Sequence, residues 1–474
     1  MKPSTSHATL GEAFFDKVEA ARFPEHVLRY RNQRAAASVG LEGLGDAEWV
    51  EHFGRFVPLP GSFPEPLALR YHGHQFQAYN PDLGDGRGFL FAQLEDERGR
   101  LLDLGTKGSG RTPWSRMGDG RLTLKGGVRE VLATAMLEAL GVDTSKSLSL
   151  IETGEELERH DEPSPTRGSV LVRLSHSHIR IGSFQRLAYL HDTPNLKRLL
   201  DYSLGTYFGI DSGNAPAETL LRLTTQRVAA TGADIIAAGF VHGVLNSDNI
   251  NITGESFDYG PWRFLPTYDP GFTAAYFDST GLYAFSRQPE ALVWNLTRLA
   301  ECLLPIGDKD GLEAALNSYW PAFRTAMWNA VLRRLGLVSR GDDIDAELVV
   351  AIFAFLNETQ IPYERFWFDW RGGMLSEARA NASPVADAYR TEAFNPIRWA
   401  FAEYAPVAEV NLDHPYFARP EPRTMLIDEM EALWAPIAES DDWSAFHRAL
   451  EEIEEMRDAY AGDRKSSMRP GTSS

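Results

Sequence analysis

The chain has 474 residues, 43% of them hydrophobic, and a formal net charge of −19. Its length and composition are those of a globular protein with two or more cores. The acidic balance argues against a nucleic-acid-binding surface, which needs clustered Lys and Arg. The single cysteine, Cys302, cannot form an internal disulfide, and the sequence has no apolar run of membrane-spanning length. We therefore expect a cytoplasmic protein with neither nucleic-acid nor membrane partners.

The first 185 residues divide into a lead-in and a strand-rich segment. Residues 1–60 are loosely patterned and are expected to pack on the core as an N-terminal extension. Four strands are predicted, at residues 89–96, 101–107, 147–152 and 169–175. The first two flank the turn ERGR and indicate a hairpin. Apolar residues from Val128 to Leu140 fall on one helical face, and Gly141 supplies a stop.

Helical patterns dominate from residue 186 onward. Residues 217–239 predict one long helix that ends at Gly239, and residues 289–303 predict another. The tail at 463–474 has a composition typical of disorder. A mixed α+β part therefore precedes a helical part.

Two glycine-rich turns surround a strand lysine in the first part. In LGDGRG (83–88), closely spaced glycines let backbone N–H groups approach phosphate oxygens, and Arg87 adds a guanidinium. Lys107 ends a predicted strand, and Glu130 lies on the helix that follows. Kinase-like folds use such a pair to hold a cation over phosphates. A glycine-rich turn alone is more often simple hairpin geometry, and an isolated Lys and Glu are more often a solvated pair. Together these features indicate a phosphate site.

The segment 242–260, HGVLNSDNINITGESFDYG, carries the strongest signal. It predicts a turn–strand–turn with Asn249 and Asp258 as oxygen ligands for Mg²⁺, and with Asp248 as a base or a metal support. Kinase-like enzymes whose loop begins with His-Gly carry an Asp next, whereas this chain has Val244. Arg173 and Arg180 suit terminal phosphates, although arginines at a lobe interface are as often structural.

These elements predict an α+β fold of the bilobal protein-kinase-like type, with a mixed β-rich N-lobe, a mainly helical C-lobe and extensions at both ends. We expect nucleotide to lie in the cleft between the lobes. The predicted divisions are the extension at 1–60, the N-lobe with nucleotide-binding elements at 61–185, the C-lobe with the catalytic and metal loop at 186–350, and a divergent helical region with a disordered tail at 351–474.

The sequence resembles the selenoprotein O (SelO) family of kinase-like protein adenylyltransferases. The matching words are GHQF (73–76), LGDGRG (83–88), KGSGRTPWSRMGDGR (107–121), Arg129-Glu130 and HGVLNSDN…DYGP (242–261), over about residues 65–320. The resemblance implies transfer of AMP from ATP to Ser, Thr or Tyr hydroxyls of proteins, with pyrophosphate released and ATP bound in an orientation flipped relative to kinases.

The resemblance also implies a role for each matching residue. Asp248 would be the catalytic base, Asn249 and Asp258 would hold Mg²⁺ or Mn²⁺, and Glu130 would orient Lys107. The residues expected to contact ATP are Gly84, Gly86, Arg87, Lys107, Asp119, Gly120, Arg173, Arg180 and Asp258. The residues themselves leave two alternatives open, namely a kinase-like phosphotransferase that uses Asp248, and a non-catalytic pseudokinase scaffold.

Overall fold

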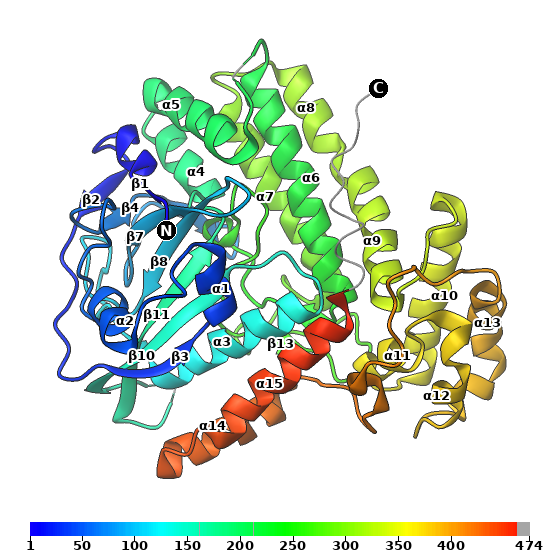
Figure 1. The fold of residues 1–474 in the computed structure, drawn as a ribbon. Coiled ribbons are helices and arrows are strands. Elements are labelled where there is room, and N and C mark those ends of the chain that lie inside the picture. Colours follow the sequence, from blue (N-terminus) through cyan, green and yellow to red (C-terminus); the bar gives the residue numbers. More distant parts are fainter. Residues whose placement is uncertain (161, 212, 462–474) are drawn as a thin grey trace.

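The computed structural model describes residues 1–160, 162–211 and 213–461. They form a β-rich lobe followed by a helical one (Figure 1). The predicted α+β class and bilobal arrangement are confirmed. No helix in these ranges is both long and apolar enough to cross a lipid bilayer. The tail from 463, predicted to be disordered, lies outside the described residues.

An antiparallel sheet forms the core of the first lobe. Its strands run in the order β2-β4-β7-β8-β11-β10-β3, with β1 paired to β7 and β9 paired to β11. The strands are β1 (Pro3–Ser4), β2 (Phe15–Lys17), β3 (Val27–Arg31), β4 (Leu67–Leu69), β7 (Leu90–Glu95), β8 (Leu101–Lys107), β9 (Leu122–Thr123), β10 (Lys146–Leu157) and β11 (Thr166–Ser175). The predicted hairpin joins β7 to β8, and Gly99 in its turn takes a φ of +74°.

The first 60 residues belong to this sheet. Strands β1, β2 and β3 pair with β7, β4 and β10. Helices α1 (Gln33–Ser38) and α2 (Asp46–Phe53) pack on one face of the sheet. Trp49 of α2 is fully buried, and its indole N–H donates to Ser149 Oγ at 2.9 Å. The segment predicted to pack on the core therefore also supplies strands to it.

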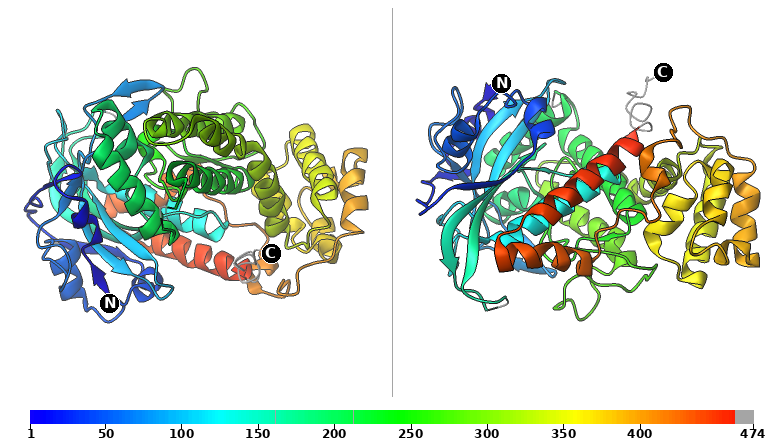
Figure 2. Two further views of the ribbon diagram at one scale, coloured as in Figure 1. Left: turned by 90° about the horizontal axis from the view of Figure 1, so that it is seen from above. Right: turned by 60° about the horizontal axis from the view of Figure 1, so that its bottom comes forward.

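The other face of the sheet carries α3 (Leu124–Ala139). The hydroxyl of Thr123 caps its N-terminus by accepting from the N–H of Gly126 at 3.1 Å. The C-terminal helices α14 (Ile427–Ser440) and α15 (Ser444–Ala459) return to this lobe, and α15 lies along α3 (Figure 2). Phe446 of α15 is fully buried, with its ring 6.3 Å from that of Tyr30 in β3. Helices α14 and α15 thus complete the core of the first lobe.

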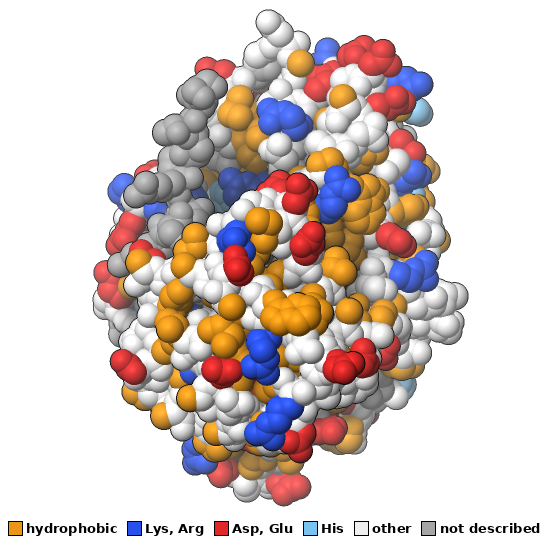
Figure 3. All heavy atoms as spheres, turned by 90° about the vertical axis from the view of Figure 1, so that its right-hand side faces the viewer, with side chains coloured by type: hydrophobic (Ala, Val, Ile, Leu, Met, Phe, Trp, Pro, Cys, Tyr) orange, Lys and Arg blue, Asp and Glu red, His pale blue; other side chains and the backbone are white. Residues whose placement is uncertain are grey.

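Helices build the second lobe. Its helices are α4 (Ile181–Tyr189), α5 (Thr193–Ser203), α6 (Pro216–Ala237), α7 (Gln288–Leu303), α8 (Lys309–Asn317), α9 (Tyr319–Leu335), α10 (Asp342–Thr359), α11 (Tyr363–Asp369), α12 (Glu377–Asn381) and α13 (Asn395–Phe401). The two predicted helices correspond to α6 and α7, and Cys302 is buried in α7. Figure 3 faces the side formed by α10–α13, where apolar and charged side chains are interspersed.

Two further two-stranded sheets are separate from the main sheet. One joins β5 (Gly73–Gln75) to β6 (Ala78–Asn80), and the other pairs β12 (Phe240–Val241) with β13 (Arg263–Phe264). The segment between β12 and β13 holds the loop singled out in the sequence. The predicted turn–strand–turn is reduced to less than a full strand. A 3₁₀ turn (Ser247–Asn249) is followed by an extended residue, Ile250, and by one isolated antiparallel bridge from Asn251 to Arg180.

Candidate active site

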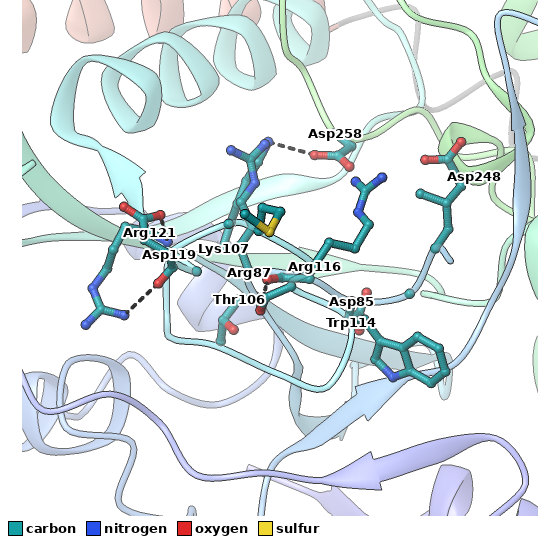
Figure 4. Close-up of a pocket in the computed structure, with 18 of the residues that line it drawn as sticks. Asp85, Arg87, Thr106, Lys107, Trp114, Arg116, Asp119, Arg121, Asp248 and Asp258 are labelled. Atoms are coloured by element: carbon teal, nitrogen blue, oxygen red, sulfur yellow. Dashed lines mark hydrogen bonds and ion pairs between the residues drawn. The ribbon is translucent and has the colours of Figure 1, made fainter. Parts of the chain in front are cut away.

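A cavity of about 730 Å³ lies where the lobes meet, and it gathers most of the predicted site residues. Its lining includes Gly84, Gly86, Arg87, Lys107, Asp119, Gly120, Arg173, Arg180, Asp248 and Asp258. Figure 4 shows the carboxylates of Asp258 and Asp248 along one wall, opposite the segment that carries Asp85 and Trp114. Residues scattered over 175 positions of sequence therefore share one concave site, as expected for a ligand pocket.

The first glycine-rich turn lies under Trp114. A Cβ atom on Gly84 would lie 2.4 Å from Trp114 Cγ, and one on Gly86 would lie 2.9 Å from the carbonyl oxygen of Trp114. The indole N–H of Trp114 donates to Asp16 Oδ2 at 2.9 Å, which ties this wall to strand β2. These glycines are therefore needed for close packing within the pocket wall. Their contact with phosphate remains a prediction.

The second turn needs glycine for a different reason. Gly120 takes a φ of +72°, and a Cβ there would lie 2.3 Å from the backbone of Gly110. Its neighbour Asp119 accepts from Arg159 at 2.8 Å and from the N–H of Arg121 at 3.0 Å. These hydrogen bonds and the Arg159 guanidinium hold the pKa of Asp119 below its ordinary value, although burial opposes the shift. The turn thus presents an ionised carboxylate at the cavity rim.

A compact cluster of two cations and two carboxylates forms the floor of the cavity. Lys107 Nζ lies 2.5 Å from Glu130 Oε2 and 2.7 Å from Asp258 Oδ1. Arg173 Nη1 lies 3.2 Å from Glu130 Oε1 and 3.3 Å from the same Asp258 oxygen. Glu130, Lys107 and Arg173 are all buried. Glu130 does not line the main cavity. It pairs with both cations, Lys107 and Arg173, on the side away from the cavity. Buried charges are stable only in such paired arrangements.

Asp258 is fixed in both backbone and charge. Its φ is +66°, a left-handed conformation that is rare for a non-glycine residue and often marks a functional site. Burial alone would raise the pKa of Asp258, but Lys107 and Arg173 hold it well below its usual range. Its carboxylate is therefore ionised, as a metal ligand must be.

Arg180 forms a second buried ion pair at the cavity wall. Its Nη1 lies 2.9 Å from Asp85 Oδ1, and its guanidinium lies 4.2 Å from the centre of the Tyr71 ring and 5.2 Å from that of Phe257. Asp85 Oδ2 also accepts from the N–H of Leu69 at 3.0 Å. This stacking and pairing hold a planar cation in one orientation, which suits recognition of phosphate.

Asp248 is the carboxylate with an unused oxygen. Its Oδ1 is buried and has no hydrogen-bond partner among the described residues. Burial raises the pKa of Asp248 to about 6, while the charge of Arg180 partly opposes the shift. Gly73 lies against it, since a Cβ there would be 3.2 Å from Asp248 Oδ1. A partly desolvated carboxylate that faces a cavity can accept a proton from a bound hydroxyl.

Asn249 is the one predicted metal ligand outside the lining of the main cavity. Its Nδ2 donates to the carbonyl of Val244 at 3.0 Å, which leaves the amide oxygen for another partner. No group of three or more His, Cys, Asp or Glu side chains in the described ranges could hold a metal alone. Mg²⁺ commonly binds through one or two carboxylates together with substrate phosphates. The ionised Asp258 and the amide oxygen of Asn249 have the donor chemistry of such a site, and Asn249 lines a separate small cavity beside His242.

Several lining residues escaped the sequence analysis. Asp85 lies inside LGDGRG, but only the fold shows that it pairs with Arg180. Trp114 lies inside the motif KGSGRTPWSRMGDGR, but nothing in that motif indicates that the Trp114 ring packs on Gly84. Arg159, in the loop between β10 and β11, contacts Asp119 across 40 positions of sequence. Each of these residues acts through a tertiary contact that no local pattern encodes.

Comparison with known proteins defines the family. The family model described as "Protein adenylyltransferase SelO" matches residues 2–454. The chain belongs to the SelO family of protein adenylyltransferases. Membership bears out the family resemblance and shows that the protein is a nucleotidyltransferase. The match also reaches well beyond residues 65–320, into the helices that complete the first lobe.

Relatives of this SelO-family chain carry the name "Protein nucleotidyltransferase YdiU". The protein from Synechocystis sp. is 44% identical over 463 residues, which cover 94% of this chain and 96% of the relative. The protein from Gloeobacter violaceus is 44% identical, with 96% and 94% covered. The protein from Vibrio cholerae is 39% identical, with 77% and 73% covered.

Proposed function

We propose that this protein transfers AMP from ATP to Ser, Thr or Tyr hydroxyls of protein substrates and releases pyrophosphate. The observation that carries the proposal is the placement of Asp248 and the Lys107–Asp258 pair on the wall of one cavity. A carboxylate able to accept a proton thus shares a pocket with cations able to hold phosphates. Membership of an adenylyltransferase family selects AMP as the transferred group.

The acceptor hydroxyl gives up its proton to Asp248. Its oxygen forms a bond to the α-phosphorus of ATP, and the bond from that phosphorus to the oxygen bridging to the β-phosphorus breaks. The electron pair of the broken bond leaves with pyrophosphate. The assignment of Asp248 as the base is supported by its place in the cavity lining and by burial, which raises the pKa of its carboxyl to about 6.

Negative charge develops on the leaving pyrophosphate, and cations in the cavity stabilise it. Lys107, Arg87, Arg173 and Arg180 all line the same space. Charges fixed in place before the reaction lower its barrier without reorganisation. Glu130 keeps Lys107 and Arg173 together, and the rim residues Gly84, Gly86, Asp119 and Gly120 complete the proposed contacts with ATP.

The proposed metal ion is Mg²⁺ or Mn²⁺, held by Asp258 and Asn249. When bound, such an ion neutralises phosphate charge and makes the phosphorus more electrophilic. The low pKa of Asp258 supports this assignment, because the side chain is ionised at neutral pH. In the absence of metal, Lys107 and Arg173 balance the same carboxylate.

The position of label from ATP tests the proposal. The protein is incubated with Mg²⁺, a mixture of unfolded and folded protein acceptors, and ATP labelled at the α- or the γ-phosphate. Label on protein from the α-phosphate only is expected. Label from the γ-phosphate only would show a phosphotransferase, and label from neither would show a scaffold, so both results contradict the proposal. The Asp258→Ala variant should transfer no label, since it lacks the proposed metal ligand.

A further inference from the structure

The β5–β6 hairpin is fastened to the loop that carries Asp248. The N–H of His74 donates to Ser247 Oγ at 2.7 Å, and the N–H of Phe76 donates to Asn246 Oδ1 at 3.0 Å. Both acceptors directly precede Asp248 in the chain. The hairpin tip therefore has a fixed position relative to the proposed base.

The tip of this hairpin adopts an unusual backbone. Phe76 and Gln77 both take left-handed conformations, with φ of +48° and +64°. A two-residue turn of this kind normally selects Asn or Gly, because side chains with a bulky Cβ are strained there. Strained backbone of this kind is concentrated at functional sites, which points to a functional constraint on the shape of the turn. The turn holds Phe76 at the surface, where 36% of the residue is exposed.

Phe76 belongs to an exposed aromatic cluster. The Phe277 ring lies 5.7 Å from that of Phe76, and the Tyr276 ring lies 5.1 Å from that of Phe277. Phe277 is 49% exposed and Tyr276 is 91% exposed. We name Phe76, Tyr276 and Phe277 the aromatic platform. Exposed apolar side chains that contact one another form the kind of patch at which proteins bind partners.

The platform has a buried support that reaches the same loop. Tyr283 is buried beneath it, with its ring 5.1 Å from that of Phe76. Its hydroxyl donates to Asn246 Oδ1 at 2.7 Å. Asn246 thus accepts both from the hairpin tip and from the support. Through these two hydrogen bonds, the Asn246 side chain connects the aromatic platform and its support to the loop that carries Asp248.

One residue of the aromatic platform, Phe76, directly follows a residue that lines the cavity. Gln75 precedes Phe76 and lines the same space as Asp248. An acceptor hydroxyl must reach Asp248, and its neighbours along an extended chain follow at intervals of roughly 3.3–3.6 Å. The hairpin that carries Phe76 is hydrogen-bonded to the two residues before Asp248, so the platform is attached to the loop that the acceptor must reach. The occupant that fits this attachment is the acceptor polypeptide.

We propose that the aromatic platform binds a large apolar side chain of the acceptor polypeptide, within a few residues of the hydroxyl that receives AMP. This inference rests on the proposed function and adds to it the class of substrate that the site selects. Phe and Tyr rings provide broad apolar contact at small cost in conformational entropy, which makes them effective anchors for a peptide side chain.

A peptide library tests the inference. Each peptide carries one Ser, Thr or Tyr, with Phe, Leu, Gly or Lys placed in turn at each of the four flanking positions on either side. Labelling from α-labelled ATP with Mg²⁺ is measured as kcat/KM. The wild-type protein should prefer Phe or Leu over Gly at one or two positions by at least about tenfold. The Phe76→Ala and Tyr276→Ala variants should lose most of this preference through a higher KM for the apolar peptides.

Trp399→Ala is the matched control, because Trp399 is an aromatic residue on α13 that is 68% exposed. It should keep the wild-type preference. Tyr276 is so exposed that its replacement does not disturb folding. Labelling without apolar preference, or preference retained in both platform variants, would overturn the inference and leave the proposed function intact. No label on any peptide or protein acceptor would overturn the proposed function, and this inference with it.

Discussion

Lys107 Nζ lies 2.7 Å from Asp258 Oδ1, so a strand of the first lobe and a loop of the second meet through one ion pair. Glu130 holds the other side of the same ammonium at 2.5 Å. The group proposed to bind phosphate and the group proposed to bind metal therefore depend on each other for position. A change to either should affect both nucleotide binding and transfer.

Lys107→Ala should weaken binding of ATP at least tenfold, since a buried charge-assisted contact is worth roughly 1.5–3 kcal/mol. The remaining carboxylates of Glu130 and Asp258 would then share Arg173 alone. Isothermal titration with ATP and Mg²⁺ measures the change. Lys125→Ala is the control, because Lys125 pairs with Glu431 on α14 and does not line the cavity. Wild-type affinity in Lys107→Ala would reject the role of this lysine.

Gly84→Ala should destabilise the pocket wall by about 1–3 kcal/mol, the usual range for overpacking. The new methyl group would meet the Trp114 ring at 2.4 Å and push it away from Asp16. We also expect a higher KM for ATP. The paired control is Gly43→Ala. A Cβ atom added at Gly43 would have no neighbouring atom within 4 Å, so this variant should match the wild type in denaturant unfolding and in KM for ATP. Equal stability of the two variants would contradict the packing role.

Glu255 should make the stability of the fold depend on pH. Burial, with a contribution from the Asp143 carboxylate, raises the pKa of Glu255 to about 8 from an ordinary value of 4.5. The folded protein therefore keeps a proton that the unfolded chain releases. The stability that this group contributes is complete below pH 4.5 and is lost as the pH rises toward 8.

Glu255→Gln should remove this dependence, because an amide does not titrate and can still accept from the N–H of His176, which donates to Glu255 at 2.8 Å. Unfolding free energies from urea titrations at pH 5, 6, 7 and 8 provide the comparison. The wild type should lose stability relative to the variant by up to roughly 1.4 kcal/mol per pH unit. A constant difference across this range would show that Glu255 is ionised in the folded protein.

Phe446→Ala should cost about 3–5 kcal/mol of stability, the range for removal of a fully buried aromatic side chain. Because α15 packs on α3, the substitution should also destabilise the first lobe, although the sequence of α3 lies about 300 residues before Phe446. Hydrogen exchange of β10 and β11 amides should quicken along with that of α15. Trp399→Ala should change stability by no more than about 0.5 kcal/mol. Unchanged exchange in the sheet would show that the C-terminal helices fold as a separate unit.

Local patterns were sufficient for much of the fold. The β7–β8 hairpin, helix α3 and helices α6 and α7 follow from periodicity and from turn residues. The strands formed by the first 60 residues could not be predicted, because their partners lie far along the chain. The return of α15 to α3 likewise depends on packing between distant segments.

The candidate site shows the same division. Sequence motifs such as LGDGRG and DYG indicated the charged side chains and the flexible glycines of the site. The structure brings most of the predicted site residues to one cavity. The pairing of Arg180 with Asp85 and the cover of Trp114 over Gly84 required the tertiary structure. The expected strand after residue 249 is limited to one bridge, from Asn251 to Arg180, a partner 71 positions earlier that the local pattern could not indicate.

A crystal structure with a non-hydrolysable ATP analogue and Mg²⁺ tests the central claim most directly. We predict that the triphosphate lies in the cavity between the lobes, with the metal on Asp258 and Asn249 and with the α-phosphorus nearest Asp248. The terminal phosphates should contact Lys107 and the neighbouring arginines. An analogue bound elsewhere, or one whose γ-phosphorus faces Asp248, would contradict the account.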